Sequence, residues 1–362
     1  MESDAVIVGG GFVGAYLSSR MGDLNTILLE RSDFKKHSTG LVSRNLFNLF
    51  NVPKNIVVNT IKAARVVFPD KRSVVFKGEA YVIDTPKFHQ YLMDRSDAKL
   101  LREEFIDFKG NIVKTSKRKI RTEVIIGADG ADSSVAKKIG VRNNFITGVE
   151  VVAPYKTSGD TLTIYLGNAP GFFSWVVPEN KDTARIGLAT YYPYDYMKRF
   201  LSELGVKKAY ESYGGLIPID FHDKMSSYRT LIVGDAAAHT KATTGGGIVT
   251  GMIAADIASD AVRKAFELKE FSAKFFRYHY DRKVLSTVGR ELKLAYWIRR
   301  IMNTFTREDY NTLYEIVNSP SIKSVLNSAD MEFYSKFIYK LLSNPKFLLF
   351  AARLGIRSYF PF

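Results

Sequence analysis

The chain has 362 residues, with 52 lysines and arginines against 37 aspartates and glutamates, which gives a net charge of +15. It contains no cysteine, which excludes a structural disulfide, a thiolate metal site and thiol redox chemistry. The five histidines are scattered, so we predict no metal site. No apolar run reaches the ~20 residues of a membrane span, and the acidic start argues against a signal peptide. We therefore expect a cytoplasmic protein of two joined domains.

An apolar strand followed by spaced glycines opens the chain. Residues 5–8 read AVIV, as in a strand buried on both faces, and glycines follow at the spacing of the dinucleotide fingerprint. The helix expected at residues 12–20 directs its first N–H groups at phosphates. A second strand, 26–29, ends in an acid about 20 residues after the first glycine, where a carboxylate accepts hydrogen bonds from ribose hydroxyls. A glycine turn that binds nothing is the alternative. The predicted ligands are Gly9, Gly11, Phe12, Val13, Gly14, Glu30 and Arg31.

Two further glycine–aspartate motifs follow predicted strands. Residues 124–126 lead into GADG at 127–130 and then into a helix that Asp132 or Ser133 can cap. Residues 230–233 lead into Gly234-Asp235, and three glycines open a helix at 248–266 whose positive end suits the pyrimidine edge of a reduced flavin. Three such motifs predict an FAD site, although Asp235 can also be a plain turn residue. The predicted ligands here are Asp129, Gly234, Asp235, Gly245, Gly246, Gly247 and Ile248.

The remaining segments predict a second sheet and a helical tail. Residues 65–81 read as two antiparallel strands around the turn 69–72, and further strands are expected at 161–166, 172–177 and 184–190. The apolar spacing after about residue 281 is helical. We expect an FAD-binding domain from residues 1–60, 85–140 and 231–280, a substrate-binding domain from 61–84 and 141–230, and a helical C-terminal region, 281–362.

Two segments carry a resemblance to a known family. Residues 234–248 read GDAAAHTKATTGGGI, and residues 170–178 read PGFFSWVVP. The chain resembles the glutathione-reductase-type FAD proteins of the hydroxylase branch, and most closely the geranylgeranyl reductases, including archaeal enzymes that saturate isoprenoid lipids. The resemblance implies an α/β fold: a Rossmann-like FAD-binding domain with an inserted antiparallel-sheet substrate domain. It also implies that the aromatic segment lines the substrate cavity, although such a strand can be plain core. The expected substrate-binding residues are Tyr165, Pro170, Gly171, Phe173 and Trp175.

The chain departs from the family pattern in several places. Ala238 stands where the family usually has glycine, and Ala242 where it usually has proline. The segment 81–89 lacks the usual arginine and aspartate, and residues 38–43 replace a cysteine–glycine pair, so no role of that cysteine applies here. His239 and Lys241 are candidates to face the flavin or a substrate phosphate, but we expect Lys241 to be an exposed loop charge.

The resemblance implies hydride transfer from a reduced flavin to isoprenoid double bonds of a lipid or prenyl diphosphate. Only one dinucleotide fingerprint is present, so we expect a transient electron donor: NAD(P)H, ferredoxin or a quinone-linked route. No catalytic residue qualifies, and the proton can come from water. The alternative is an FAD monooxygenase acting on an aromatic or lipid substrate. A third alternative is a flavin protein that passes electrons to a partner, but the relatives of this kind, the electron-transfer-flavoprotein oxidoreductases, usually carry an iron–sulfur module that needs cysteines. A flavin-free scaffold is the remaining alternative.

The positive charge has three explanations. Nucleic-acid binding is disfavoured because no binding motif is present. A generally lysine-rich surface is the simplest explanation. The third is peripheral contact with an anionic membrane, at its inner face, because the tail mixes aromatic and basic residues. The same pattern suits a helical cap over the substrate domain. The tail residues concerned are Phe333, Tyr334, Lys336, Phe337, Ile338, Tyr339, Lys340, Leu341, Leu342, Lys346, Phe347, Leu348, Leu349, Phe350, Arg353, Arg357, Tyr359 and Phe360.

Overall fold

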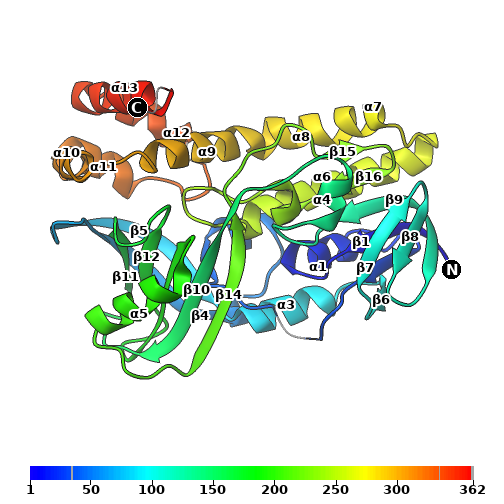
Figure 1. Ribbon diagram of the computed structural model, residues 1–362, viewed down its shortest axis with the longest axis horizontal. Coiled ribbons are helices and arrows are strands. Elements are labelled where there is room, and N and C mark those ends of the chain that lie inside the picture. The colour runs from blue at the N-terminus through cyan, green and yellow to red at the C-terminus, as the bar shows by residue number, and fades with distance from the viewer. Residues whose placement is uncertain (34–35, 334, 360–362) are drawn as a thin grey trace. The chain divides into compact units, whose positions relative to one another are not determined.

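The computed structural model describes residues 1–33, 36–333 and 335–359, with side chains in the last helix described up to residue 355. The chain divides into two compact units, each with its own sheet (Figure 1). Unit 1 consists of Met1–Lys36, Thr85–Phe145 and Leu216–Lys293, and unit 2 of His37–Asp84, Ile146–Gly215 and Leu294–Phe362. Both units are therefore discontinuous in sequence.

The sheet of unit 1 has a parallel centre. Its strand order is β15-β16-β9-β1-β2-β6, and the pairs β16–β9, β9–β1, β1–β2 and β2–β6 are parallel. The central strands are apolar and buried on both faces, as parallel sheets require. The predicted strands at 5–8, 26–29, 124–126 and 230–233 are confirmed. The strands are β1 Glu2–Val8, β2 Thr26–Leu29, β6 Lys99–Leu101, β7 Phe105–Lys109, β8 Ile112–Thr115, β9 Lys119–Gly127, β15 Ser226–Ser227 and β16 Thr230–Ile232.

Two helices that follow glycine turns pack against each other in unit 1. These are α1 (Phe12–Ser19) and α6 (Ile248–Leu268). The Tyr16 hydroxyl donates to Asp256 at 2.9 Å, and Arg20 forms an ion pair with the same carboxylate at 2.9 Å. The other helices are α3 Thr85–Met93, α4 Ser134–Lys138, α7 Ala273–Phe276 and α8 Arg282–Val284, with π-helical turns at Arg277–Asp281 and Leu285–Gly289 and a 3-10 turn at Gly234–Ala237.

The sheet of unit 2 is mostly antiparallel. Its order is β14-β10-β13-β12-β11-β4-β5-β3. The pairs β10–β13, β13–β12, β12–β11, β4–β5 and β5–β3 are antiparallel, while β11 runs parallel to β4. The predicted hairpin and the three later strands are confirmed, and the hairpin is longer than expected. The strands are β3 Leu41–Ser43, β4 Val57–Val67, β5 Ser73–Ile83, β10 Phe145–Pro154, β11 Thr161–Leu166, β12 Phe173–Pro178, β13 Thr183–Thr190 and β14 Glu211–Pro218.

Helix α5 (Pro193–Glu203) covers one face of this sheet. Met197 and Phe200 pack there on alternate strand residues, among them Val151, Val176 and Ile186. Side chains of opposite parity, such as those of Glu150 and Trp175, belong to the other face because strand residues alternate. Two short elements precede the hairpin: α2 Asn45–Leu49 and a 3-10 turn, Lys54–Ile56.

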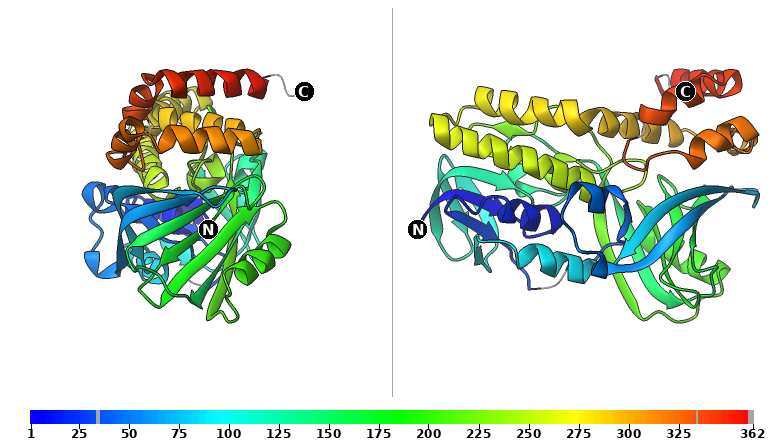
Figure 2. Two further views of the ribbon diagram at one scale, coloured as in Figure 1. Left: turned by 90° about the vertical axis from the view of Figure 1, so that its left-hand side faces the viewer. Right: turned by 180° about the vertical axis from the view of Figure 1, so that it is seen from behind.

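The helical C-terminal region is confirmed and packs on the β4–β5 hairpin (Figure 2). Phe68 and Val74 of the hairpin share a core with Ile316, Leu341 and Phe350. Among the described residues, no helix is both long and apolar enough to cross a bilayer. The helices are α9 Arg290–Met302, α10 Arg307–Val317, α11 Pro320–Asn327, α12 Ser335–Leu342 and α13 Pro345–Tyr359.

Candidate functional site

The turn between β1 and α1 is built by three glycines with different roles. Gly9 has a φ of +100°, and a Cβ there would lie 2.4 Å from the Ala128 carbonyl oxygen. A Cβ on Gly14 would lie 1.9 Å from the Gly9 carbonyl oxygen, so only glycine allows α1 to pack this closely. A Cβ on Gly11, by contrast, meets no described atom within 4 Å. The backbone at Gly11 is therefore open to an approaching ligand, next to the first turn of a helix.

Glu30 lies at the end of β2 beside this turn. Its carboxylate accepts the Gly10 N–H at 2.9 Å and the Ser32 N–H and hydroxyl at 3.0 Å each. Burial acts to raise the pKa of Glu30, but the hydrogen bonds from Ser32 and Gly10 outweigh it and lower the pKa below its usual value. Glu30 is therefore ionised at neutral pH and is fixed at the carboxyl edge of the sheet, where a ribose diol can donate to it.

The neighbours of the fingerprint have structural roles in the described chain. Phe12 is buried and stacks on Phe88, with ring centroids 5.7 Å apart. Val13 lies against Gly234, whose Cβ would be 3.1 Å from the valine side chain. Arg31 is exposed and forms an ion pair with Glu104 at 3.5 Å. Phe12 and Val13 thus fix the turn, whereas Arg31 lies on the surface and pairs with another exposed residue.

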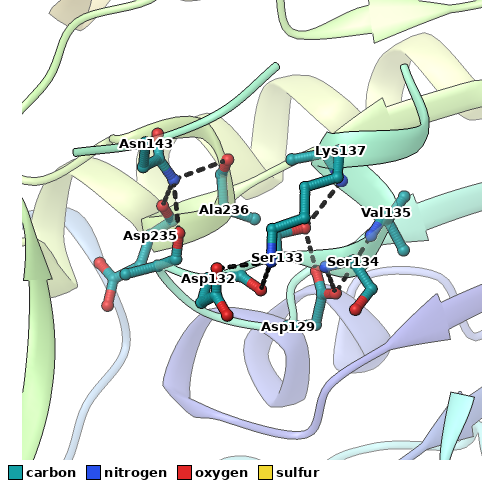
Figure 3. Close-up of polar contacts among 11 residues, drawn as sticks. Asp129, Asp132, Ser133, Ser134, Val135, Lys137, Asn143, Asp235 and Ala236 are labelled. Carbon is teal, nitrogen blue, oxygen red and sulfur yellow. Dashed lines mark hydrogen bonds and ion pairs between the residues drawn. The ribbon is translucent and has the colours of Figure 1, made fainter. Parts of the chain in front are cut away.

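Asp129 organises the second motif by capping a short helix (Figure 3). Its carboxylate accepts the Ser133 hydroxyl at 2.5 Å and the Ser134 N–H at 2.7 Å. Ser133 in turn accepts the Ala136 N–H at 2.8 Å, which confirms it as the N-cap of α4. Burial raises the pKa of Asp129. The carboxylate of Asp129 is therefore engaged by its own loop.

Asn143, which belongs to none of the predicted motifs, joins the second motif to the third (Figure 3). Its amide nitrogen donates to the carbonyl oxygens of Ala131 at 2.9 Å and Asp235 at 3.0 Å. Its amide oxygen contacts His222 Nε2 at 2.7 Å. One side chain thus sets the distance between the two loops. The role of Asn143 can be recognised only from these contacts, because its partners lie far from it in the sequence.

Asp235 and the triple glycine meet at the start of α6. The Asp235 carboxylate accepts the Thr240 hydroxyl at 2.5 Å, and burial raises its pKa. A Cβ on Gly247 would lie 2.5 Å from the Thr240 hydroxyl oxygen and 3.3 Å from the Asp235 carboxylate. Among the described residues, no side chain caps α6 at Gly247, and Ile248 follows half-buried. Its first N–H groups are available to a ligand.

The loop before α6 closes on itself, and its lysine is buried. The Lys241 N–H donates to the Gly246 carbonyl at 3.0 Å, and the Gly245 N–H donates to the Lys241 carbonyl at 2.8 Å. Gly245 has a φ of +74°. The expectation that Lys241 is an exposed loop charge is wrong, because only 3% of this residue is exposed. The tight 241–246 turn folds the lysine back toward the glycines.

His239 is a structural residue of the core. The Gly234 N–H donates to its Nδ1 at 3.1 Å, and its Nε2 contacts the Met225 sulfur at 3.1 Å. Burial lowers the pKa of His239 to about 3, so the ring is neutral. The ring is buried and both of its nitrogens are engaged within unit 1, which argues against the predicted role of His239 beside a flavin or a phosphate.

In unit 2, the predicted substrate residues separate onto two faces of the sheet. The Phe173 and Trp175 rings meet edge to face at 5.9 Å. Tyr165 pairs with Ser174 across β11 and β12, and its ring contacts Phe200 of α5 at 5.2 Å. The expectation that Tyr165 shares a wall with Trp175 is therefore wrong, because the register places it on the opposite face.

Pro170 and Gly171 lie in the tight turn that leads into β12. Gly171 has a φ of +82°, and its carbonyl accepts a hydrogen bond from Arg299 at 3.0 Å. The Arg299 guanidinium lies 4.3 Å from the centroid of the Phe172 ring, which stacks on Phe173. Arg299 of α9 thus holds the turn, and the turn orients the stacked rings of Phe172 and Phe173 at the start of β12.

An indole, a glycine and a buried carboxylate lie side by side across three strands of unit 2. Trp175 pairs with Gly187, and Gly187 pairs with Glu150. A Cβ on Gly187 would lie 2.5 Å from the Trp175 ring, so the indole lies across β13 where a side chain is missing. Its N–H donates to the Glu150 carboxylate at 2.5 Å. Sequence reasoning missed both Gly187 and Glu150, because strand register brings them together.

The unit 1 geometry fits a long dinucleotide. It offers an open glycine at one helix start, an uncapped second helix start, and an ionised acid at the edge of the same sheet. Gly11 and Glu30 follow the carboxyl ends of β1 and β2, and Asp235 follows the carboxyl end of β16 in the loop that leads to α6. Open α/β sheets bind ligands at these ends of their strands. In the described residues no cluster of acids and histidines is arranged to hold a metal ion.

Comparisons with known proteins agree with this geometry. No family model matches the chain. The digeranylgeranylglycerophospholipid reductase 2 of Methanothermobacter thermautotrophicus is 26% identical to it, over 90% of this chain and 94% of that protein. Other archaeal proteins with the same name are similar over most of the chain.

Solved structures show the fold. A geranylgeranyl bacteriochlorophyll reductase-like protein of Thermoplasma acidophilum superimposes with a TM-score of 0.82 at 17% identity, over 98% of this chain and 99% of that chain. PqsL, a probable FAD-dependent monooxygenase of Pseudomonas aeruginosa, gives 0.66 at 14% identity, over 87% and 100%. The chain therefore has the fold of FAD-dependent reductases and monooxygenases, and its resemblance to the geranylgeranyl reductases is confirmed.

Proposed function

We propose that this protein is an FAD-dependent oxidoreductase that reduces carbon–carbon double bonds in the isoprenoid chain of a lipid or prenyl diphosphate. The observation that carries the proposal is the open backbone at Gly11, beside an ionised Glu30 and an uncapped α6, in a chain whose archaeal relatives are named as such reductases. Bound FAD would supply a hydride to the alkene. The protein's own residues bind, orient and exclude water.

The residues of unit 1 divide the work of binding the cofactor. Gly11 and the start of α1 would take the pyrophosphate, and Glu30 the ribose. The start of α6, with Gly245–Gly247 and Asp235, would take the isoalloxazine side. Asp129 and Asn143 shape the loops that these groups depend on. In unit 2, Phe173 and Trp175 would contact the isoprenoid chain, because both rings belong to the sheet face opposite the one that α5 covers.

Mass spectrometry of the molecules that co-purify with the protein, together with a visible spectrum, tests this function. FAD absorbance with a bound isoprenoid or phospholipid is the expected result. Anaerobic reduction of an added isoprenoid would then give a product heavier by two hydrogens for each double bond. A product carrying an added oxygen, with oxygen consumed, would instead support the monooxygenase, which shares this fold. Comparing NAD(P)H with reduced ferredoxin in the same assay identifies the electron donor.

We further propose that the C-terminal helices contact an anionic membrane surface. Residues 333–362 contain five lysines and arginines and no acid. On α12 and α13 the buried side packs into the core through Leu341, Phe350 and Leu354, while Tyr339, Leu348 and Leu349 are exposed. Exposed apolar residues among cations suit lipid headgroups. Tyr334 and Phe360, also part of the predicted pattern, lie outside the described residues, as do the side chains of Arg357 and Tyr359.

Vesicle flotation tests this contact. The protein should float with vesicles of phosphatidylglycerol and not with phosphatidylcholine, and Leu349→Ser or Lys346→Glu should weaken flotation several-fold. Because exposed charges are screened by salt, about 0.5 M salt should release much of the protein. Equal binding to both kinds of vesicle, or no effect of either substitution, would contradict the proposal. Lys207→Glu, an exposed lysine after α5, is the matched control.

A further inference from the structure

Glu150 is a buried acid held by three hydrogen-bond donors. The Trp175 indole, the Thr39 hydroxyl and the Tyr213 hydroxyl each donate to its carboxylate at 2.5 Å. Only 3% of Glu150 is exposed, and in the described part of the chain no lysine, arginine or histidine forms an ion pair with it. A buried carboxylate without an ion pair is costly to keep charged. Glu150 therefore tends to hold a proton.

Protonation of Glu150 must reverse the direction of one of its three hydrogen bonds. The protonated carboxyl group becomes a donor and needs an acceptor. The indole N–H can only donate, whereas a hydroxyl can both donate and accept. Thr39 or Tyr213 must therefore turn and accept the proton, and its own hydrogen then points away from Glu150. In this way the cluster can pass a proton outward without moving the carboxyl group.

The charges around the cluster come from several elements. Arg185 of β13 is buried and forms an ion pair with Glu179 at 2.7 Å, and it holds the Thr39 carbonyl at 2.7 Å. The exposed His37 ring lies 5.3 Å from the Tyr213 ring. Burial raises the pKa of Glu150, and the three hydrogen bonds and Arg185 oppose this only in part. Burial also raises the pKa of Tyr213, so its hydroxyl stays protonated.

We propose that Glu150 supplies the proton that the alkene needs, passed through the hydroxyl of Thr39 or Tyr213. This inference rests on the proposed function. A bound, reduced flavin would supply the hydride for one carbon of the double bond, and Glu150 supplies the proton for its neighbour, so that the π bond is replaced by two C–H bonds. Glu150 is left as a carboxylate, which three donors stabilise, and it regains a proton from solvent. The Trp175 indole, fixed to the same carboxylate, holds one wall beside this proton source.

Single-turnover reduction of an isoprenoid by the flavin-loaded, pre-reduced protein tests the proposal. Glu150→Gln should slow the reduction at least about 100-fold, because general acids contribute factors of about 10² to 10⁴. The wild-type rate should fall as pH rises through the pKa of Glu150, and this dependence should vanish in Glu150→Gln. Whichever of Thr39→Val and Tyr213→Phe slows the step about tenfold or more identifies the route. Tyr155→Phe removes a phenol on the α5 side of the sheet and is the matched control.

A second readout does not need turnover. The chain has two tryptophans, so a Trp297→Phe background leaves Trp175 as the sole tryptophan, which can be excited selectively over the tyrosines. Its fluorescence should titrate with Glu150 and stop doing so in Glu150→Gln. If Glu150→Gln does not fold, the pH profile of the wild-type rate and the rates of Thr39→Val and Tyr213→Phe still test whether the cluster supplies the proton. A wild-type protein that reduces isoprenoids while all three variants match it would overturn the inference alone. A wild-type protein that reduces no isoprenoid would overturn the proposed function as well.

Discussion

The two units build their sites by different means. Unit 1 uses backbone: glycines that let main-chain groups approach a ligand, and two helices whose N-cap residue is a glycine, with no side-chain cap in the described part of the chain. Unit 2 uses side chains, drawn from β12, β10, β14 and the segment before β3, that meet at one carboxyl group. A site built from backbone groups can be recognised from short local motifs in the sequence. A site built from side chains of several strands depends on the register in which those strands pair.

Gly14→Ala should have the largest effect, because the backbone of unit 1 leaves no room for a methyl group there. A Cβ would lie 1.9 Å from the Gly9 carbonyl oxygen. We expect the free energy of unfolding to fall by about 3 kcal/mol or more. Chemical denaturation followed by circular dichroism measures this.

Gly11→Ala is the matched control for that prediction. Its Cβ meets no described atom within 4 Å, so stability should change by less than about 1 kcal/mol. Flavin affinity should nevertheless fall at least about tenfold, equal to about 1.4 kcal/mol. Normal flavin binding by Gly11→Ala would show that the pyrophosphate does not approach this residue.

Acid should destabilise unit 1 through His239. The pKa of this ring is about 3 in the fold because of burial, whereas an unfolded histidine titrates near 6.5. As pH falls from about 6.5 toward 3, the unfolded state binds a proton that the folded state refuses, so stability falls by up to about 1.4 kcal/mol per pH unit. His239→Asn, whose Oδ1 can accept from the Gly234 N–H, should reduce this dependence.

Glu150 should give unit 2 the opposite response. Its pKa is raised in the fold, so its contribution is full below the ordinary glutamate pKa and is lost as pH rises through the folded value. Both tryptophans belong to unit 2, so their fluorescence reports that unit, while flavin absorbance reports unit 1. Denaturation between pH 4 and 8 with both probes measures the two trends. Parallel trends would contradict this account.

Gly187→Ala tests the side-chain site of unit 2. The new methyl group would lie 2.5 Å from the Trp175 ring and 2.7 Å from the Val149 carbonyl oxygen, which should cost about 1–3 kcal/mol. Trp175 emission should shift as the indole leaves Glu150. Gly215→Ala on β14, whose Cβ meets no described atom within 4 Å, should change neither property. An unchanged emission spectrum in Gly187→Ala would show that the indole has room to remain.

Glu30→Gln should have the smallest effect. The amide keeps one acceptor but loses the charge that the Gly10 and Ser32 N–H groups stabilise. We expect about 1 kcal/mol of lost FAD affinity, because hydrogen bonds to charged groups exceed neutral ones by about that amount. Isothermal titration measures it, with the exposed Glu104→Gln as control. A tenfold or larger loss would mean that Glu30 carries more of the cofactor's binding than a single ribose contact.

The sequence predicted what depends on neighbours along the chain. The buried strands, the glycine turns and the start of α6 follow from local patterns, and the structure confirms them. Of the two predicted caps of α4, Asp132 and Ser133, the structure shows Ser133. The sequence did not predict the register of the strands in unit 2 or the folding back of the loop before α6. Tyr165 falls on the α5 face because it pairs with Ser174, and Lys241 is buried because its loop folds back on Gly246. Asn143 and Glu150 carry no motif, since their partners lie far away in sequence.

The contact between α1 and α6 bears on how the cofactor enters and leaves. A Cβ on Gly251 would lie 2.6 Å from the Val13 side chain, so this side chain of α1 packs directly on the α6 backbone. Asp256 of α6 in addition binds both Tyr16 and Arg20. The N-terminal ends of α1 and α6 are thus held in place relative to each other before any ligand binds. Little conformational entropy remains to be lost on binding. The empty protein should therefore keep the amide protons of both helices protected from exchange with solvent and take up FAD without a slow folding step.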